Sequence, residues 1–495
     1  MDFLYDINNG AAEITGFKGG EQVFEIPERL GGAPVRSIGN EAFLSCTARK
    51  IKLNTGLSKI GNSAFARCPH LEEINLPEGL EDIGDSAFDS CGALKRIYIP
   101  SSVRRIGDKA FSWCNKMGEL EFAGGDLTIG FNSFSFCTGI EKIEFKEGLK
   151  YIGKAAFSVC GGLKSVMFPE SLKEIGSQAF EACSMLEYIG FKKGLKKIGS
   201  WAFRECKSLM AVDIPETVTE IGDGAFLSCI LIKSVKVPEG VKRINDWVFG
   251  KCRGIERMEL PEGVEELSSF SFSRCRRIKY FHMPKTVKIV RRGAFSVCSE
   301  LERVEFSENL ELIEERAFEI CSGLRVITVP YTLKGLSKKM FYECGGLYGI
   351  ELITGDSRAL RVFVPYEPRG IRFIKDYRGG NIDFERYDFM FAGLKRFECK
   401  RDMAFFRLKN KTDLTDKAEK MYTDYLRRFS KRIIDEAIKN GDIETIGIMG
   451  LRKLIIKKHI EEYIKASSEH GGLCTGFFID YRNKNFGQIR KRFVL

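Results

Sequence analysis

One short segment repeats almost without interruption along this chain of 495 residues. One copy reads IGNSAFARCPHLEEINLPEGLED and runs from Ile60 to Asp82. The copy before it, from Ile38 to Lys59, is one position shorter, and every later copy keeps the 23-residue length. A fixed period of this length is the signature of a solenoid, and it outranks any local secondary-structure preference. The 14 copies begin at Ile38, Ile60, Ile83, Ile106, Ile129, Ile152, Ile175, Ile198, Ile221, Ile244, Leu267, Val290, Ile313 and Leu336.

Each copy contains a strand signal and a tight-turn signal. Ile74 and Leu76 are two positions apart, so they point to one face of a short strand, and Pro77 ends that strand because proline cannot donate to a ladder. The segment from Ser63 to Cys68 favours a short helical or 3₁₀ turn. One coil cannot bury its apolar face alone, so neighbouring coils must stack. At ~4.8 Å per coil, the stack would be roughly 65 Å long.

The repeat resembles the BspA-type leucine-rich repeat, whose pattern is IGxxAFxxCxxLxxIxLPxGV. Here it stands, for example, as IGDSAFDSCGALKRIYIPSSV from Ile83 to Val103. The resemblance covers about Ile38 to Leu352. It implies an α/β solenoid that is curved and right-handed and binds proteins or other ligands, with no catalytic residues and no cofactor.

Fourteen of the sixteen cysteines occupy one repeat position. A column of identical positions one coil apart indicates packing, with cysteine acting as a small buried hydrophobe. Disulfides between adjacent coils would meet the distance requirement, but parallel side chains favour free thiols. The chain has four histidines and no CxxC pair, so we expect no metal site. The column comprises Cys46, Cys68, Cys91, Cys114, Cys137, Cys160, Cys183, Cys206, Cys229, Cys252, Cys275, Cys298, Cys321 and Cys344.

The flanking segments divide the chain into four parts. Residues 1–36 contain short strand patterns around Asn-Gly and Gly-Gly turns and would cap the open apolar end of the stack. Residues 37–353 form the solenoid. Residues 354–411 include RALRVFVPYEP, IRFIKDY and an aromatic-rich stretch, which favour strands or irregular structure, and we assign them to a distal cap or bridge. Residues 412–495 form an all-α module.

Helix signals dominate this last part. Thr415 can cap a helix that runs to Lys439, where Asn440-Gly441 stops it. Shorter helices are expected at about 443–451, 457–468 and 473–482. The arrangement is similar to the helix pairs of ankyrin-like modules, although the ankyrin TPLH signature is absent, so the similarity concerns shape only.

Candidate contact residues are aromatic or apolar residues at repeat positions that are small or polar in other copies. Exposed contiguous aromatic residues mark contact sites. The alternative is that these side chains lean over the coil edge and pack against neighbouring turns or against the C-terminal helices. The residues preceding the repeated Cys are Trp113, Phe136 and Val159, and those preceding the repeated Ala are Trp201, Trp247 and Phe270.

A formal net charge of +11 raises the possibility of an anionic partner. One cluster of basic residues could attract nucleic acid, although it lacks the interleaved aromatic residues of a stacking platform. The alternative is that these basic residues form a solvated surface without a binding role. The candidate basic patch is Arg274, Arg276, Arg277, Lys279, Arg291 and Arg292.

No sequence pattern indicates catalysis, since GxxxxGK[ST], HExxH and GxSxG are all absent. The favoured interpretation is a non-enzymatic scaffold that binds a protein partner of unknown identity. The N-terminal residues MDFLYDINNG show no signal peptide, and the chain lacks an apolar run long enough to span a bilayer, so we expect a cytoplasmic protein without a membrane span. The alternatives are a secreted or cell-surface adhesin and, less favoured, a nucleic-acid-associated protein.

Overall fold

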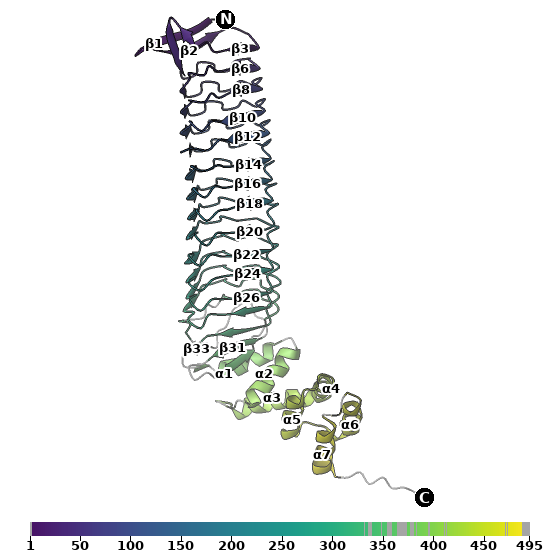
Figure 1. The fold of residues 1–495 in the computed structure, drawn as a ribbon. Coiled ribbons are helices and arrows are strands. Elements are labelled where there is room, and N and C mark those ends of the chain that lie inside the picture. The colour runs from purple at the N-terminus through teal and green to yellow at the C-terminus, as the bar shows by residue number, and fades with distance from the viewer. Residues whose placement is uncertain are drawn as a thin grey trace. The chain divides into compact units, whose positions relative to one another are not determined.

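The computed structural model shows a stack of coils followed by a set of helices (Figure 1). It describes residues 2–330, 332–334, 339–347, 349–353, 359–363, 374–376, 381–382, 384–394, 397–409, 411, 413–470, 472 and 474–487. The chain divides into a first compact unit that ends at Leu347 and a second that begins with β31 (Gly349–Ile353). Each unit is described separately below, and Leu336, the first residue of the last copy, lies outside the described residues.

The 23-residue period produces one coil per copy, which confirms the predicted solenoid. Repeat positions are counted here from Ile60 as position 1, and coil 1 begins at Ile38. Positions 14–16 form a short strand in which position 15 is buried, as the alternation of Glu73, Ile74 and Asn75 shows. Corresponding strands of neighbouring coils lie side by side in parallel, so Ile51 pairs with Ile74. These strands are β3 (Val23–Glu25), β6 (Lys50–Lys52), β8 (Glu73–Asn75), β10 (Arg96–Ile99), β12 (Glu119–Phe122), β14 (Lys142–Glu144), β16 (Ser165–Met167), β18 (Tyr188–Gly190), β20 (Val212–Asp213), β22 (Ser234–Lys236), β24 (Arg257–Glu259), β26 (Tyr280–His282), β28 (Arg303–Glu305) and β30 (Val326–Val329).

A second, shorter strand in each coil differs from the single strand that was expected. It joins the last residue of one copy to the first of the next, and it pairs in parallel with its equivalents. Gly84 at position 2 explains how closely these segments approach, because a Cβ there would lie 2.6 Å from the carbonyl carbon of Gly61. The strands are β7 (Lys59–Ile60), β9 (Asp82–Ile83), β11 (Arg105–Ile106), β13 (Thr128–Ile129), β15 (Tyr151–Ile152), β17 (Glu174–Ile175), β19 (Lys197–Ile198), β21 (Glu220–Ile221), β23 (Arg243–Ile244), β25 (Glu266–Leu267), β27 (Ile289–Val290) and β29 (Leu312–Ile313).

The side of the coil predicted as a helical or 3₁₀ turn consists instead of consecutive tight turns. Ser63 and Arg67, at positions 4 and 8, have φ of +55° and +56°, in the left-handed region. The amides of Ser63, Phe65 and Arg67 donate to carbonyls of the next coil at 2.7–2.8 Å, whereas those of Ala64 and Ala66 donate within their own coil. A helix would use its amides internally. Stacking of coils therefore replaces the helix by a backbone that hydrogen-bonds along the solenoid.

Two columns of side chains fill the interior. The phenylalanines at position 6 stack coil upon coil, with Phe65 and Phe88 centroids 5.2 Å apart and nearly parallel. From Cys68 onward, each buried cysteine at position 9 donates its thiol to the phenylalanine carbonyl of the preceding coil, as Cys91 does to Phe65 at 3.1 Å. All sixteen cysteines are buried and free, in agreement with the packing role expected for the column.

The N-terminal segment forms strands that continue the stack. Strands β1 (Asp2–Asn8) and β2 (Ala11–Lys18) form a hairpin, and β4 (Arg29–Leu30) pairs with β5 (Ala33–Ile38), which joins the short-strand sheet of the coils. Phe24 continues the aromatic column at 5.8 Å from Phe43.

The second unit begins with two antiparallel strand pairs. β31 pairs with β32 (Ala359–Phe363), and β33 (Ile374–Asp376) pairs with β34 (Asn381–Ile382). β31 comes from residues that were assigned to the solenoid, and the other three lie where strands or irregular structure was expected. The intervening residues 364–373 lie outside the described part of the chain.

The aromatic-rich stretch that follows is helical, so the expectation of strands or irregular structure was wrong there. Its elements are α1 (Phe384–Met390), η1 (Phe391–Gly393) and α2 (Phe397–Lys409). Tertiary packing overrides the strand preference of aromatic residues: Phe391 meets Tyr422 edge to face at 4.8 Å, and Phe397 meets Phe429 at 5.5 Å.

The C-terminal helices appear close to their predicted positions, with one break. Thr415 caps α3 (Asp416–Arg428) by accepting from the Ala418 amide, and Gly441, with φ +66°, ends α4 (Ser430–Asn440). The single helix expected from Thr415 to Lys439 is interrupted at Phe429. The remaining elements are α5 (Ile443–Leu451), η2 (Lys457–His459), α6 (Ile460–Glu469) and α7 (Thr475–Phe486).

A buried ionic network holds the first helices of this unit together. Arg407 is fully buried and makes two hydrogen bonds to Asp388, at 2.7 and 3.0 Å. Tyr422 donates to the same carboxylate at 2.6 Å, and burial followed by this hydrogen bond raises the pKa of its phenol. The Arg407 guanidinium also lies 4.1 Å from the centre of the Phe384 ring.

Candidate partner-binding surfaces

The first predicted aromatic set lies on the turn side of coils 4 to 6, at position 8. Trp113 stacks on Phe136 with ring centroids 4.1 Å apart and an interplanar angle of 4°. Trp113 keeps 47 % of its surface exposed, whereas Phe136 and Val159 are half-buried. All three residues have φ near +60°, a conformation that costs a residue with a Cβ about 1–2 kcal/mol.

The second predicted set, at position 4, leans along the solenoid. Trp247 stacks on Phe270 at 4.5 Å. Trp201 and Phe270 each lie over a glycine of the next coil, since a Cβ on Gly224 would stand 2.2 Å from Trp201 and one on Gly293 would stand 2.3 Å from Phe270. These rings are therefore partly engaged in packing between coils.

Sequence reasoning missed these two glycines, although a signal exists. Each glycine stands one period after an aromatic residue at the same repeat position. The pattern of an aromatic residue followed by glycine in the next copy predicts a ring lying on bare backbone. The two aromatic sets are not brought together, because they occupy different repeat positions and different coils.

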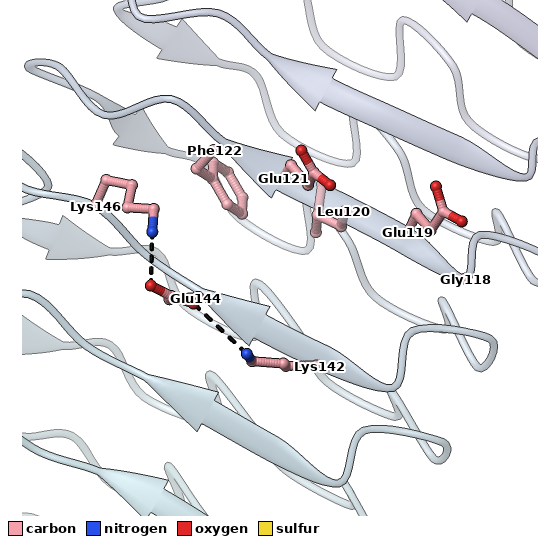
Figure 2. A pocket seen from close by; sticks show the side chains of 8 residues that line it. All are labelled: Gly118, Glu119, Leu120, Glu121, Phe122, Lys142, Glu144 and Lys146. Carbon is pink, nitrogen blue, oxygen red and sulfur yellow. Dashed lines mark hydrogen bonds and ion pairs between the residues drawn. The ribbon is translucent and has the colours of Figure 1, made fainter.

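The long-strand face carries a shallow depression over coils 4 and 5 (Figure 2). Glu144 accepts from Lys146 at 2.6 Å and lies 3.6 Å from Lys142, and the hydrogen bond to Lys146 lowers the pKa of this carboxyl group. Glu119 and Glu121 point outward from β12 and have no ion pair among the described residues. The site offers unpaired carboxylates beside lysines, which suits contact with a polar protein surface.

A second polar cluster on the same face joins β26 and β28. The Glu305 carboxylate accepts from the Tyr280 hydroxyl, lies 3.1 Å from Nδ1 of His282 and forms an ion pair with Arg303 at 2.8 Å. The Tyr280 hydrogen bond, followed by that of His282, lowers the pKa of Glu305. The carboxylate is already satisfied by neighbouring coils, which indicates a structural role.

The candidate basic patch is dispersed over the surface of coils 11 and 12. Arg274 is on the turn side at position 8, whereas Arg276, Arg277 and Lys279 precede the long strand. Arg277 forms an ion pair with Glu256 at 3.2 Å.

The other two members of that patch are paired with glutamates of neighbouring coils. Arg291 lies between Glu266, at 2.9 Å, and Glu314, at 2.8 Å, and Arg292 lies 3.7 Å from Glu315. The structure therefore does not assemble these six residues into one cationic surface.

The described part of the chain holds no group of three or more His, Cys, Asp or Glu side chains placed to bind a metal ion. Burial raises the pKa of the Cys183, Cys252 and Cys298 thiols to about 12, so these are not nucleophiles at neutral pH. Among the described helices, none has the length and apolarity needed to cross a membrane.

Parallel stacking of 23-residue coils around a phenylalanine and cysteine core defines a solenoid repeat protein. Residues 36–137, 127–256 and 219–348 match the family described as BspA type leucine rich repeat region, in six copies. These residues make up more than half of the chain, which therefore belongs to this family.

Several solved structures are similar to this chain. A leucine-rich repeat protein from Bacteroides ovatus is 25% identical, with a TM-score of 0.54, and the match covers 70% of this chain and 98% of that one. A leucine-rich cell surface protein from Faecalibacterium prausnitzii is 20% identical (TM-score 0.40; 70% and 92% covered). The pneumococcal vaccine antigen PcpA is 19% identical (TM-score 0.45; 68% and 88% covered). No curated protein matches the chain.

Proposed function

We propose that this chain is a non-enzymatic scaffold that binds a protein through its solenoid, with the Trp113–Phe136 stack as a principal contact. The observation that carries the proposal is the half-exposed Trp113 indole, held in a stack with Phe136. Tryptophan is enriched among the residues that contribute most to protein interfaces. Membership of a repeat family that presents extended surfaces supports the same interpretation.

The geometry of position 8 supplies a clean variant for testing this contact. Glycine accepts a positive φ without strain, so Trp113→Gly removes the ring and relieves the backbone. Loss of the ring stack destabilises the variant by about 0.5–1.5 kcal/mol, and relief of the backbone strain offsets this loss. We therefore expect the fold to survive while the contact disappears.

The test is affinity capture from a nuclease-treated lysate of the source organism, using the full chain as bait. Wild type is compared with Trp113→Gly/Phe136→Gly and with Ser228→Gly, a control at the same position with φ +65°. We expect one partner to be retained by wild type and by the control and lost by the double variant. Equal retention by all three baits would show that the partner does not bind through Trp113 and Phe136. Catalytic turnover by the purified chain would contradict the non-enzymatic assignment.

We also propose that the second unit contributes a further contact surface. Leu451, at the end of α5, is 87 % exposed, and Phe389 of α1 is similarly open. Solitary exposed apolar residues are common, so exposure alone does not establish a contact. In the same capture experiment, a Leu451→Ser bait should lose a protein that the Trp113→Gly/Phe136→Gly bait retains. If Leu451→Ser loses nothing, Leu451 is not a contact residue.

We place the protein in a reducing compartment such as the cytoplasm. Support comes from sixteen cysteines that are all free and buried, because chains in oxidising compartments commonly form disulfides. Fractionation of source cells tests this. Recovery at the cell surface would replace the proposal with a role as a surface adhesin.

A further inference from the structure

The residue at position 13, just before each long strand, forms an exposed column in which charges alternate. Backbone hydrogen bonds connect successive members, from the Glu187 amide to the Lys164 carbonyl at 2.9 Å and from the Glu256 amide to the Lys233 carbonyl at 2.8 Å. Wherever two neighbouring members are charged, they have opposite signs. The charge column comprises Arg49, Glu72, Lys95, Gly118, Glu141, Lys164, Glu187, Met210, Lys233, Glu256, Lys279, Glu302 and Arg325.

Met210 interrupts this column in coil 8 and is 55 % exposed. Exposed Met185 and Tyr188 of coil 7 and exposed Leu231 of coil 9 surround it, all within positions 11–14 of their coils. The solenoid therefore presents an apolar patch of four large side chains where a charge would continue the column.

The charges on either side of Met210 lack their usual neighbours. In coils 2 to 6, Lys164 reaches back to Glu141 at 2.9 Å, and Lys95 reaches Glu72, whereas Lys279 and Glu302 further along have no ion pair among the described residues. Neither Glu187 nor Lys233 has an ion pair among the residues that the structure describes. An apolar centre flanked by one free anion and one free cation has the composition of an interface.

The order of charges on the two sides of Met210 indicates which partner binds the apolar patch. Read outward from Met210, one direction gives Glu187, Lys164 and Glu141, and the other gives Lys233, Glu256 and Lys279. At each of these three distances from Met210, the two residues have opposite charge; five coils away, Lys95 and Arg325 are both basic, so the match is confined to the central seven coils. This arrangement is what a two-fold axis requires, because residue i of one copy then meets residue j of the other, and j meets i.

We propose that the patch around Met210 binds a second copy of this chain, in antiparallel orientation, about a two-fold axis that runs parallel to the strands through coil 8. Met210 then meets its own equivalent, and Met185 meets Leu231 of the second copy. Glu187 faces Lys233, Lys164 faces Glu256, and Glu141 faces Lys279, each pair occurring twice. With ~4.8 Å between coils, these seven coils give a contact roughly 30 Å long.

Two other residues of coil 8 lie at the edges of this contact. Lys207 at position 10 and Asp213 at position 16 are exposed and would each approach their own equivalent across the axis. Like charges facing one another oppose association, so the contact is confined to the column between them. Such a narrow contact belongs to the small end of specific interfaces, where association is weak to moderate and sensitive to salt.

The test measures the oligomeric state of the purified full chain by sedimentation velocity over a range of micromolar concentrations. We expect a monomer–dimer equilibrium in the wild type that Met210→Glu abolishes. Glu187→Lys and Lys233→Glu should each weaken association by about tenfold or more, because each creates two like-charge pairs. The double variant Glu187→Lys/Lys233→Glu should restore association, since opposite charges again face each other. Arg274→Glu, on the turn side, serves as a matched charge-reversal control and should leave the equilibrium unchanged.

These residues are exposed, so the variants should fold, and circular dichroism with thermal unfolding checks this. A wild type that stays monomeric overturns the proposal. Single reversals that leave association intact also overturn it. So does a double reversal that fails to restore association, because restoration is expected only if Glu187 of one copy faces Lys233 of the other. The outcome is independent of the Trp113 contact, which lies on the turn side of coils 4 and 5.

Discussion

The indole ring of Trp201 lies over the α-carbon of Gly224, one coil further along, so that a Cβ on Gly224 would stand 2.2 Å from Trp201 Cδ1. Gly224 also has φ +59°. The glycine therefore serves two needs: a left-handed backbone and a flat surface for the ring.

Gly224→Ala should destabilise the solenoid by about 1–3 kcal/mol, because alanine is strained at this φ and displaces the indole. Urea unfolding measures the change. Gln178→Ala, at the same repeat position with φ +60° and no overlying aromatic ring, should stay within about 0.5 kcal/mol of wild type. In Trp201→Ala/Gly224→Ala the clash is absent, so the double variant should lose less than the sum of the two single variants. Strict additivity would show that the ring and the glycine do not interact.

The cysteine column should make stability fall at high pH. Burial raises the pKa of Cys183 to about 12, whereas the ordinary pKa of an exposed thiol is about 9.0. Above pH 9 the unfolded chain loses this proton and the folded chain keeps it, so each such cysteine lowers the free energy of unfolding by up to ~1.4 kcal/mol per pH unit until about pH 12.

Unfolding in urea between pH 8 and 10.5 measures this dependence. Cys183→Ala should show a smaller slope than wild type above pH 9, together with a loss at pH 7 of about 1–2 kcal/mol from the missing hydrogen bond to the Phe157 carbonyl and the smaller side chain. Equal slopes for the two proteins would contradict the shifted thiol pKa.

The Asp388–Arg407 pair should be the most sensitive polar contact of the helical unit. Removing one partner leaves a charge buried and uncompensated, so Asp388→Ala should cost about 3–5 kcal/mol. Tyr422→Phe deletes one hydrogen bond to the same carboxylate and should cost about 1–2 kcal/mol. Circular dichroism at 222 nm follows the loss of helix, and an Asp388→Ala protein as stable as wild type would show that the network is not required.

Arg291 should behave as a structural residue and not as part of an anion-binding surface. It joins Glu266, whose side chain is 10% exposed, to Glu314, so Arg291→Ala should destabilise the chain by about 1–3 kcal/mol. Arg276→Ala, an exposed substitution two coil positions from Arg274, should change stability by less than about 0.5 kcal/mol. Thermal unfolding distinguishes them, and equal effects would remove the structural assignment of Arg291.

The repeat period was enough to predict the solenoid, because Ile, Phe, Cys and Leu recur at positions that only stacked coils can bury together. The free state of the cysteines followed from the same reasoning. The left-handed turns at Ser63 and Arg67 were not predictable in this way, since they depend on hydrogen bonds to the next coil of the stack. Helix α2 was missed for a related reason: the Phe397 ring packs against Phe429, and this tertiary contact decides the outcome, not the strand preference of Phe397 itself.

Among the candidate sites, the six aromatic or apolar positions could be located from the sequence, but their surroundings could not. Only the structure distinguishes Trp113, stacked and half-exposed, from Trp201, which leans on Gly224. The charge column around Met210 was readable in the sequence, although its meaning depends on knowing that position 13 is exposed and continuous from coil to coil.

The coil-to-coil hydrogen bonds of the turn side have a consequence for how such a chain can change in length. Because the amide of Phe65 uses a carbonyl of the following coil in the same way as its equivalents do elsewhere, removal of one whole period leaves every backbone donor with an acceptor of the same kind. The backbone thus tolerates deletion or duplication in units of one complete coil. The charges of position 13 do not tolerate it where the deleted coil has charged neighbours on both sides, since loss of the coil that carries Lys164 would bring Glu141 and Glu187 together. The interior of such a molecule therefore sets no limit on the number of coils, whereas its surface charges favour removal of the coils that carry Gly118 or Met210, whose neighbours at position 13 have opposite charges.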